Sequence, residues 1–247
     1  MTSVKWFVCP QPNPAAGTRL FIFPYAGGVP AAFNKWTAKD IETYIAHYPG
    51  RGSRFNEPPM KRIDTLVENI LQAIQPLLDK PFALFGHSMG GLIAFELARK
   101  LRQQKQPQPK LFFVSASVAP QFPDPNPPIH ALPDDEFLYA LKKLNGIPAE
   151  ILNQPEALKL FLPILRADFE AVETYRFDSS QPLLDIPIIA IGGLDDPRVT
   201  REQLEGWADQ TSSRFEAEQF PGGHFFITST IAPVLRLVAG ASHAHEK

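Results

Sequence analysis

Cysteine is almost absent from this sequence, which has one, Cys9, among 247 residues. A single thiol excludes an intramolecular disulfide and a metal site built from several cysteines, and it is typical of a reducing compartment. The sequence also lacks an apolar run of membrane-spanning length, and its first residues lack the charged and apolar regions of a signal peptide. We therefore expect a cytoplasmic protein that does not bind membranes.

A strong charge of either sign is missing as well. The formal net charge is −2, from 24 Lys and Arg against 26 Asp and Glu, and no basic stripe is visible. Nucleic acid is therefore not an expected partner. Hydrophobic residues make up 44% of the chain, as in an ordinary globular protein. A chain of this length can bury the core of one α/β domain, and two small domains are the alternative.

Short apolar segments alternate with amphipathic ones, a pattern that predicts an α/β fold with a mostly parallel central sheet flanked by helices. The clearest helical pattern follows Arg62, and a second covers Leu92–Leu101. Thr65 and Glu68 have the spacing of a capping box at the start of the first helix. The predicted strands are Lys5–Val8, Arg19–Phe23, Glu42–Ala46, Phe82–Phe85, Leu111–Val114, Ile188–Ile191 and Phe215–Gln219.

The composition changes after residue 119, where Pro123–Pro128 is too rich in proline for a helix or a central strand. Two helical patterns follow, Asp134–Leu144 and Glu156–Tyr175, and Pro163 should kink or break the second. We interpret them as a lid over the sheet, although two extra surface helices would give the same pattern. The predicted organisation is a core of residues 1–119 and 183–247 with a helical lid insertion at 120–182.

The most informative motif is Gly-x-Ser-x-Gly, from Gly86 to Gly90, which lies between an apolar segment and a helical pattern. This order is typical of a nucleophile elbow, a strained strand-to-helix turn that exposes the serine hydroxyl. The helix that follows directs its N-terminal N–H groups at the reacting atom. Ser88 is therefore the predicted nucleophile of an α/β-hydrolase fold.

A serine hydroxyl needs a base, and on this fold an acid and then a histidine follow the serine in chain order. A strand pattern is followed by adjacent Asp195 and Asp196, and a later glycine-rich loop carries His224. The predicted catalytic triad is Ser88, His224 and one of these aspartates. We favour Asp196, which directly precedes a proline, and Asp195 is the alternative. His87 flanks the nucleophile and should instead pack on the other side of the elbow.

Acyl transfer also needs two backbone N–H groups about 3 Å from the oxyanion. Met89 follows the nucleophile and is the first predicted donor. The second should come from Phe-Pro-Tyr-Ala-Gly-Gly at residues 23–28, whose glycines let the backbone approach a substrate oxygen. We expect Ala26 to supply it, with Tyr25 and Gly27 as alternatives.

Four motifs carry a resemblance to a known family: Phe-Pro-Tyr-Ala-Gly-Gly at 23–28, Tyr-Pro-Gly-Arg-Gly-Ser-Arg at 48–54, Phe-Gly-His-Ser-Met-Gly-Gly at 85–91 and Gly-Gly-His-Phe-Phe at 222–226. They resemble the type II thioesterases, the free-standing editing hydrolases of polyketide synthases and nonribosomal peptide synthetases. Lid residues 132–137 and 161–168 resemble the same family. Generic esterases share only the elbow, so the first two motifs matter most.

This resemblance implies that Asp196, the second aspartate of the Gly-x-Asp-Asp loop, is the triad acid. It implies hydrolysis of acyl, aminoacyl or peptidyl thioesters from the phosphopantetheine arm of carrier proteins, through an acyl-serine intermediate. Carrier-protein domains would be the partners, no metal or other cofactor would be needed, and we expect a monomer. Pro123–Pro128 departs from the family pattern, which leaves the shape of the acyl channel open.

Three other hypotheses stay open from the sequence. A general carboxylesterase or lipase would prefer oxygen esters. An acyltransferase or cyclising thioesterase would resolve the acyl-enzyme with a nucleophile other than water. A non-catalytic binding protein with this fold would have no need of Ser88, Asp196 and His224 together.

Overall fold

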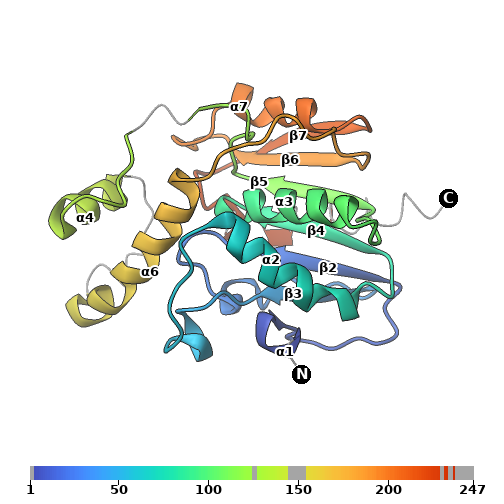
Figure 1. The fold of residues 1–247 in the computed structure, drawn as a ribbon, viewed down its shortest axis with the longest axis horizontal. Coiled ribbons are helices and arrows are strands. Elements are labelled where there is room, and N and C mark those ends of the chain that lie inside the picture. Colours follow the sequence, from blue (N-terminus) through green and yellow to red (C-terminus); the bar gives the residue numbers. More distant parts are fainter. Residues whose placement is uncertain (1–2, 124–126, 144–153, 229–230, 233–235, 237–247) are drawn as a thin grey trace.

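The computed structural model describes residues 3–123, 127–143, 154–228, 231–232 and 236. A seven-stranded sheet lies at its centre, in the order β1-β3-β2-β4-β5-β6-β7 (Figure 1). β1 pairs antiparallel with β3 and all other pairings are parallel, which confirms the predicted mostly parallel sheet. The strands are β1 Phe7–Val8, β2 Thr18–Phe23, β3 Ile41–Ala46, β4 Phe82–His87, β5 Leu111–Ser115, β6 Ile188–Gly193 and β7 Phe215–Phe220.

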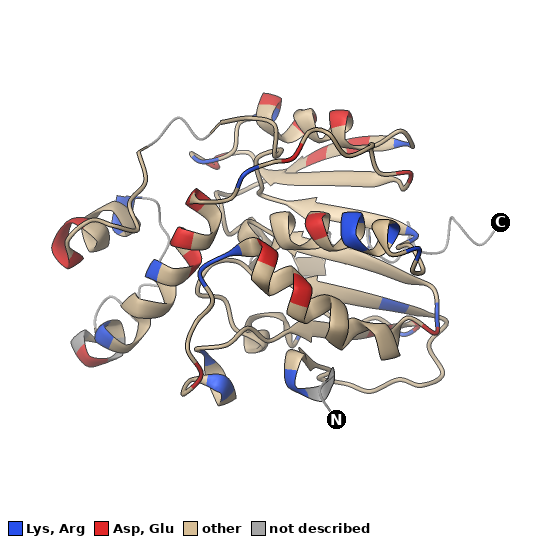
Figure 2. Cartoon of the chain, viewed as in Figure 1, with Lys and Arg blue, Asp and Glu red and all other residues tan. Residues whose placement is uncertain are grey.

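The three strands β4, β5 and β6 form the most apolar part of the sheet. Every residue in them is buried, and none carries a Lys, Arg, Asp or Glu side chain (Figure 2). A parallel sheet is covered on both faces, so its central strands are apolar without a break. Their carboxyl ends meet at one edge of the sheet, where the loops that follow them come together.

Two long helices, α2 (Ile63–Ile74) and α3 (Met89–Gln103), cover one face of the sheet (Figure 1). Leu84 faces their cluster of buried residues, whereas the next residue, Phe85, faces the opposite side, because successive side chains of a strand alternate. On that side Trp36 packs on Phe85 with their ring centres 4.6 Å apart. The shorter helical segments are α1 Ser3–Trp6, α7 Arg201–Glu205 and the 3-10 turns Pro30–Phe33, Gly52–Arg54, Gln75–Leu77, Gly206–Gln210 and Phe226–Thr228.

The predicted first strand is wrong in its first half. Lys5 and Trp6 lie in α1, and only Phe7 and Val8 pair with β3. The Trp6 side chain is buried beneath Arg54, whose guanidinium carbon lies 4.2 Å from the ring centre. This packing overrides the strand propensity of the segment.

The predicted capping box of α2 is also wrong. The N-cap of α2 is Arg62, so Thr65 lies inside the first turn. Asp64 does the capping there, because its Oδ1 accepts the Thr65 N–H at 2.7 Å. A carboxylate in the first turn also interacts favourably with the helix dipole.

Two helices, α4 (Asp134–Lys143) and α6 (Pro155–Glu173), stand beyond one end of the sheet (Figure 1). They are the helices predicted for the lid, and the last residue of the first prediction, Leu144, lies outside the described residues, as do residues 124–126. The two helices share a buried cluster of four apolar side chains: Phe137, Leu141, Leu165 and Phe169.

The predicted break at Pro163 is absent, because α6 continues through it. Proline removes the hydrogen bond to the carbonyl four residues earlier, which belongs to Lys159. Lys159 is exposed, so water can satisfy that carbonyl. Pro163 therefore destabilises α6 less than it would if the unpaired carbonyl were buried.

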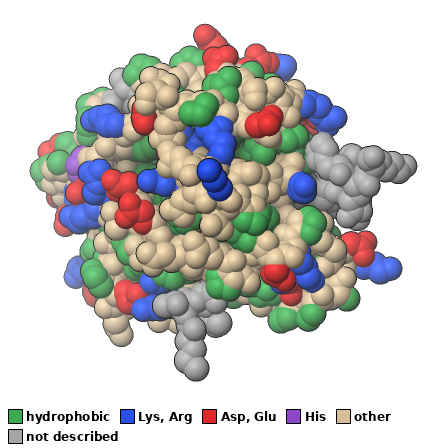
Figure 3. All heavy atoms as spheres, turned by 45° about the vertical axis from the view of Figure 1, so that its right-hand side comes forward, with side chains coloured by type: hydrophobic (Ala, Val, Ile, Leu, Met, Phe, Trp, Pro, Cys, Tyr) green, Lys and Arg blue, Asp and Glu red, His purple; other side chains and the backbone are tan. Residues whose placement is uncertain are grey.

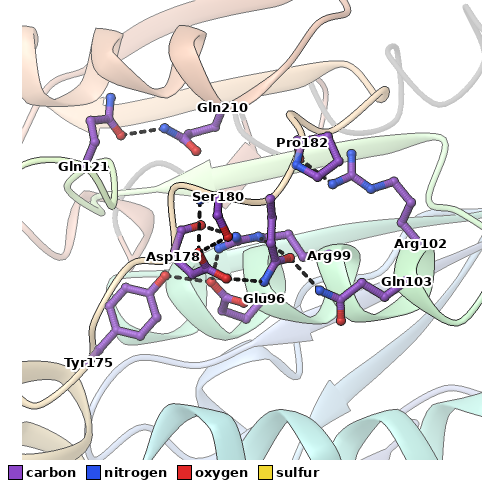
Figure 4. A network of polar contacts seen from close by, with 11 residues as sticks. Glu96, Arg99, Arg102, Gln103, Gln121, Tyr175, Asp178, Ser180, Pro182 and Gln210 are labelled. Atoms are coloured by element: carbon purple, nitrogen blue, oxygen red, sulfur yellow. Dashed lines mark hydrogen bonds and ion pairs between the residues drawn. The ribbon is translucent and has the colours of Figure 1, made fainter.

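Polar side chains fix the segment between α6 and β6 onto α3 (Figure 4). Tyr175 donates to Glu96 Oε1 at 2.7 Å, and Arg99 donates to the same oxygen at 2.7 Å. Arg99 also reaches Gln181 Oε1 at 3.1 Å, and Arg102 donates to two carbonyl oxygens of the segment. The chain that follows α6 is therefore anchored on α3.

The surface carries charges of both signs. On the face shown in Figure 3, Lys and Arg side chains are interspersed with Asp and Glu and do not gather into one patch. Across the described residues, no helix combines the length and the apolarity that crossing a membrane requires.

Candidate active site

Ser88 lies at a sharp turn between β4 and α3. Its backbone has φ 54° and ψ −119°, a conformation that residues with a side chain rarely adopt. Two hydrogen bonds hold the turn: Ser88 N–H donates to Ser115 O and Gly91 N–H donates to Ser88 O, each at 2.8 Å. The geometry is that of the predicted nucleophile elbow.

The glycines around Ser88 are required by close backbone approaches. A β-carbon on Gly86 would lie 2.2 Å from Gly90 O, and one on Gly90 would lie 1.9 Å from Phe23 O. Both distances are far shorter than any van der Waals contact. Only glycine therefore lets the start of α3 pack against the ends of β4 and β2.

His224 joins the serine to an aspartate. Its Nε2 lies 3.0 Å from Ser88 Oγ, and its Nδ1 lies 2.8 Å from Asp196 Oδ2. The Asp196 Oδ1 accepts the Arg198 N–H at 2.9 Å. The serine follows β4, the aspartate follows β6 and the histidine follows β7, so the parallel sheet brings three distant segments together. The structure thus unites the three residues of the predicted triad in one hydrogen-bonded chain.

The neighbouring Asp195 does not share this position. Its side chain is exposed, and its backbone N–H donates to Gly222 O at 2.9 Å, which ties the acid loop to the histidine loop. Only Asp196 has a carboxylate oxygen on the His224 ring. The geometry therefore favours Asp196 over Asp195.

Burial controls the protonation of His224. The ring is buried, and desolvation lowers its pKa below 6.5, against the opposing effect of the Asp196 hydrogen bond; the Arg198 charge adds to the lowering. A lowered pKa keeps the imidazole neutral at pH 7. Neutral imidazole, with Nδ1–H donated to Asp196, leaves Nε2 free to accept the Ser88 proton.

His87 has a packing role, as the sequence indicated, and its ring centre lies 5.4 Å from that of His224. It is fully buried, its Nδ1 lies 2.8 Å from Ser115 Oγ, and burial holds its pKa well below the usual value. Its ring packs edge-on against Tyr25, with ring centres 5.6 Å apart. His87 therefore packs between β5, the loop after β2 and the histidine loop.

The two predicted oxyanion donors come from different segments. Met89 opens α3, and Ala26 lies in the loop after β2. In that loop the Gly27 N–H donates to Asp168 Oδ2 at 2.7 Å, and the Gly28 N–H donates to Tyr25 O at 2.8 Å. Because its N–H already donates to Asp168, Gly27 is excluded as the second oxyanion donor. The assignment of Ala26 and Met89 stays a prediction.

One buried ion pair next to the site was missed from the sequence. Arg51, after β3, donates to both carboxylate oxygens of Asp168 in α6, at 2.7 and 2.8 Å. Two signals pointed to it. Arg51 is part of the Pro-Gly-Arg-Gly motif, and Asp168 shares a helical face with apolar Phe161 and Leu165. A lone carboxylate on an apolar face indicates a buried partner.

Comparison with known proteins shows similarity along almost the whole chain. A family model described as a thioesterase domain matches residues 18–240. Gramicidin S biosynthesis protein GrsT of Aneurinibacillus migulanus is 43% identical over 226 residues, which cover 90% of this chain and 88% of that protein.

Two solved structures are similar in fold. The type II thioesterase BorB from the borrelidin biosynthetic cluster has 32% identity and a TM-score of 0.87, over 96% of this chain and 97% of that one. The RedJ thioesterase from the prodiginine pathway of Streptomyces coelicolor has 34% identity and a TM-score of 0.86, over 92% and 91%. The predicted α/β-hydrolase fold is confirmed by this agreement.

Proposed function

Because this chain belongs to the thioesterase domain family, we propose that it is a type II thioesterase that releases acyl, aminoacyl or peptidyl groups from the phosphopantetheine arms of carrier proteins. The observation that carries the proposal is His224, hydrogen-bonded to both Ser88 and Asp196 in a chain of this family. Among the similar proteins, GrsT is named for the biosynthesis of gramicidin S, and BorB is a type II thioesterase from the borrelidin biosynthetic cluster.

The first half of the reaction acylates Ser88. His224 Nε2 accepts the hydroxyl proton as Ser88 Oγ attacks the thioester carbonyl carbon, and Asp196 stabilises the imidazolium that forms. The negative charge on the carbonyl oxygen is received by the N–H groups of Met89 and Ala26. The tetrahedral intermediate then expels the pantetheine sulfur.

Departure of the sulfur needs little assistance. A thiol has a pKa of about 8.5, so its thiolate is a much better leaving group than an amine. His224 returns the proton to the sulfur, and the acyl group stays on Ser88 as an ester. In the second half, water gives a proton to His224 as it attacks that ester. His224 then returns the proton to Ser88 Oγ, which leaves as the hydroxyl while the carboxylic acid is released.

A carrier-protein domain of a polyketide synthase or nonribosomal peptide synthetase is the proposed partner. The lid helices α4 and α6, with the apolar cluster between them, support a lid that covers the acyl group during turnover. We further propose that the protein is a monomer, that it is located in the cytoplasm and that it requires no metal or other cofactor.

A hydrolysis panel tests the proposal. Acetyl, aminoacyl and long-acyl groups are loaded on a carrier protein and on coenzyme A, and butyrate is offered as a p-nitrophenyl ester. We expect carrier-protein thioesters to have the highest kcat/KM. Equal activity on the oxygen ester would favour a general esterase and contradict the proposal.

The nucleophile is tested by Ser88→Ala. We expect kcat to fall by about 10⁴-fold or more, because the covalent route is removed while binding is retained. Circular dichroism checks that the fold is intact. Mass spectrometry of the wild-type protein quenched with a slow substrate should show the acyl group on the peptide containing Ser88. Retained turnover by the variant would contradict the assignment.

A further inference from the structure

Asp168 in α6 is one of the most deeply buried charged residues of the described chain, with 1% of its surface exposed. Its Oδ2 accepts from Gly27 N–H at 2.7 Å and from Arg51 Nη1 at 2.7 Å, and its Oδ1 accepts from Arg51 Nη2 at 2.8 Å. One carboxylate therefore joins a lid helix to the loop after β3 and to the loop after β2. The last of these carries the proposed oxyanion donor Ala26.

The loop after β2 also packs closely against α6. Gly27 has φ +74°, and a β-carbon there would lie 2.7 Å from Phe161 Cζ and 2.8 Å from Leu165 Cδ2. Both side chains belong to α6, so the helix presses directly on the loop. Tyr48 supports the loop from the other side, because its hydroxyl donates to Pro24 O at 3.3 Å.

Arg51 is itself held in place. Its Nε donates to Pro49 O at 3.2 Å, and its guanidinium carbon lies 5.2 Å from the centre of the Tyr48 ring. Only 2% of its side chain is exposed, so these contacts and the pair with Asp168 leave the guanidinium little freedom to move. The carboxylate is therefore oriented by a rigid fork, and its Oδ2 is directed at the Gly27 N–H.

We infer that Asp168 is a positioning residue for the oxyanion hole: it holds the Gly27 N–H so that the preceding Ala26 N–H is directed towards the oxygen that becomes negative during attack by Ser88. The inference rests on the proposed function of Ser88. It makes α6 part of the catalytic scaffold, so the helix cannot move away from the sheet without displacing an oxyanion donor.

The test compares two double variants in which uncharged side chains replace both members of the buried ion pair, R51M/D168N and R51M/D168L. Asparagine and leucine have similar volumes, but only asparagine has an oxygen that can accept the Gly27 N–H. We expect kcat for a small acyl thioester to be about tenfold to a hundredfold lower in the leucine variant, since a 1 Å misplacement can cost about a hundredfold. KM should differ by less than about threefold, because ground-state binding does not use the hole.

Inhibition by a boronic acid distinguishes a role in the oxyanion hole from a purely structural role. Phenylboronic acid adds to the serine oxygen as a tetrahedral anion and places an oxygen in the hole. Its inhibition constant should rise in the leucine variant by about the same factor as kcat falls. Equal kcat and equal inhibition constants in the two double variants would overturn the inference.

A second ion pair controls for loss of stability. Glu96 pairs with Arg99 and accepts a hydrogen bond from Tyr175, and so anchors the segment that follows α6 (Figure 4). Single variants D168L and E96L each leave an arginine without its carboxylate and should both lower the melting temperature, but only D168L should lower kcat and speed amide exchange in residues 23–28. If a double variant does not fold, this pair decides, and equal kcat losses in D168L and E96L would contradict the inference.

The small thioester separates this inference from the proposed function. A wild-type protein that hydrolyses the small thioester but no carrier-protein thioester would contradict the proposed substrate. The comparison of the asparagine and leucine variants would still be measurable in that case.

Discussion

Ser88 is held in a backbone conformation that costs about 1–3 kcal/mol for a residue with a side chain. The turn persists because the hydrogen bonds from Ser88 N–H to Ser115 O and from Gly91 N–H to Ser88 O fix it on both sides. In exchange, the hydroxyl stands clear of the backbone, 3.0 Å from His224 Nε2. The strain is confined to this turn, which the hydrogen bond to Ser115 O ties to β5.

The acid of the triad is tested by comparing Asp196→Asn with Asp195→Asn. Asparagine at 196 can hold the wrong imidazole tautomer, so we expect kcat to fall by about 10³-fold to 10⁴-fold. Asp195 contributes its backbone N–H to the acid loop, and this bond survives substitution of its exposed side chain. Its variant should therefore keep kcat within about threefold of the wild type. A larger loss at 195 than at 196 would reverse the assignment.

The pH dependence of activity follows from the buried imidazole. Activity requires neutral His224, so kcat/KM falls as the pH drops through the pKa of the free enzyme. Burial lowers that pKa below 6.5, and we expect the midpoint of the acidic limb to lie below this value. Rates are measured from about pH 4.5 to about pH 8, with unfolding monitored in parallel so that acid denaturation is separated. A midpoint above 6.5 would contradict the role of burial.

At the scale of elements, the contact between α3 and β2 depends on Gly90. The first turn of α3 lies so close to the end of β2 that there is no space for a methyl group between them. This contact brings Ser88, at the start of the helix, next to the oxyanion loop that follows β2. The packing of two elements therefore sets the distance between nucleophile and oxyanion hole.

Gly90→Ala tests this packing, with Gly17→Ala as the control. A β-carbon on Gly90 would lie 1.9 Å from a backbone oxygen, whereas nothing lies within 4 Å of one on Gly17. Since backbone must move, we expect Gly90→Ala to lower the free energy of unfolding by about 3 kcal/mol or more. Gly17→Ala should change it by less than about 1 kcal/mol. Urea unfolding measures both, and equal effects would show that the contact is not tight.

The elements were predictable where a local pattern decides the structure. The strands β4, β5 and β6 were found because apolar runs fill the part of the sheet that is buried on both faces, and Ser88 was found because the elbow is a local turn. The contact between Arg51 and Asp168 spans 117 residues and depends on the docking of α6. No local pattern encodes that docking, so the support of the oxyanion loop became visible only in three dimensions.

On the scale of the whole molecule, the apolar residues form separate clusters. Two lie on the two faces of the sheet, and a third lies between α4 and α6. The third is small, and all of its fully buried members come from those two helices. We therefore expect the lid to loosen at a lower free energy than the sheet.

Phe112→Ala and Phe137→Ala distinguish these clusters. Phe112 is buried against Trp207 at the centre of the molecule, and its truncation should cost about 3–5 kcal/mol of unfolding free energy. Phe137 is buried on α4 in the third cluster. Its truncation should mainly speed amide exchange in α4, with a global cost below about half that of Phe112→Ala. Equal global costs would mean that lid and sheet unfold as one unit.

The described sheet ends at β7, and its last strand carries two carboxylates, Glu216 and Glu218, on exposed positions. The unpaired edge of a strand is a template for another strand, and this is how many proteins begin to aggregate. A second copy that added its own β7 there would bring like charges close to one another. The two carboxylates therefore disfavour edge-to-edge pairing between copies of the chain.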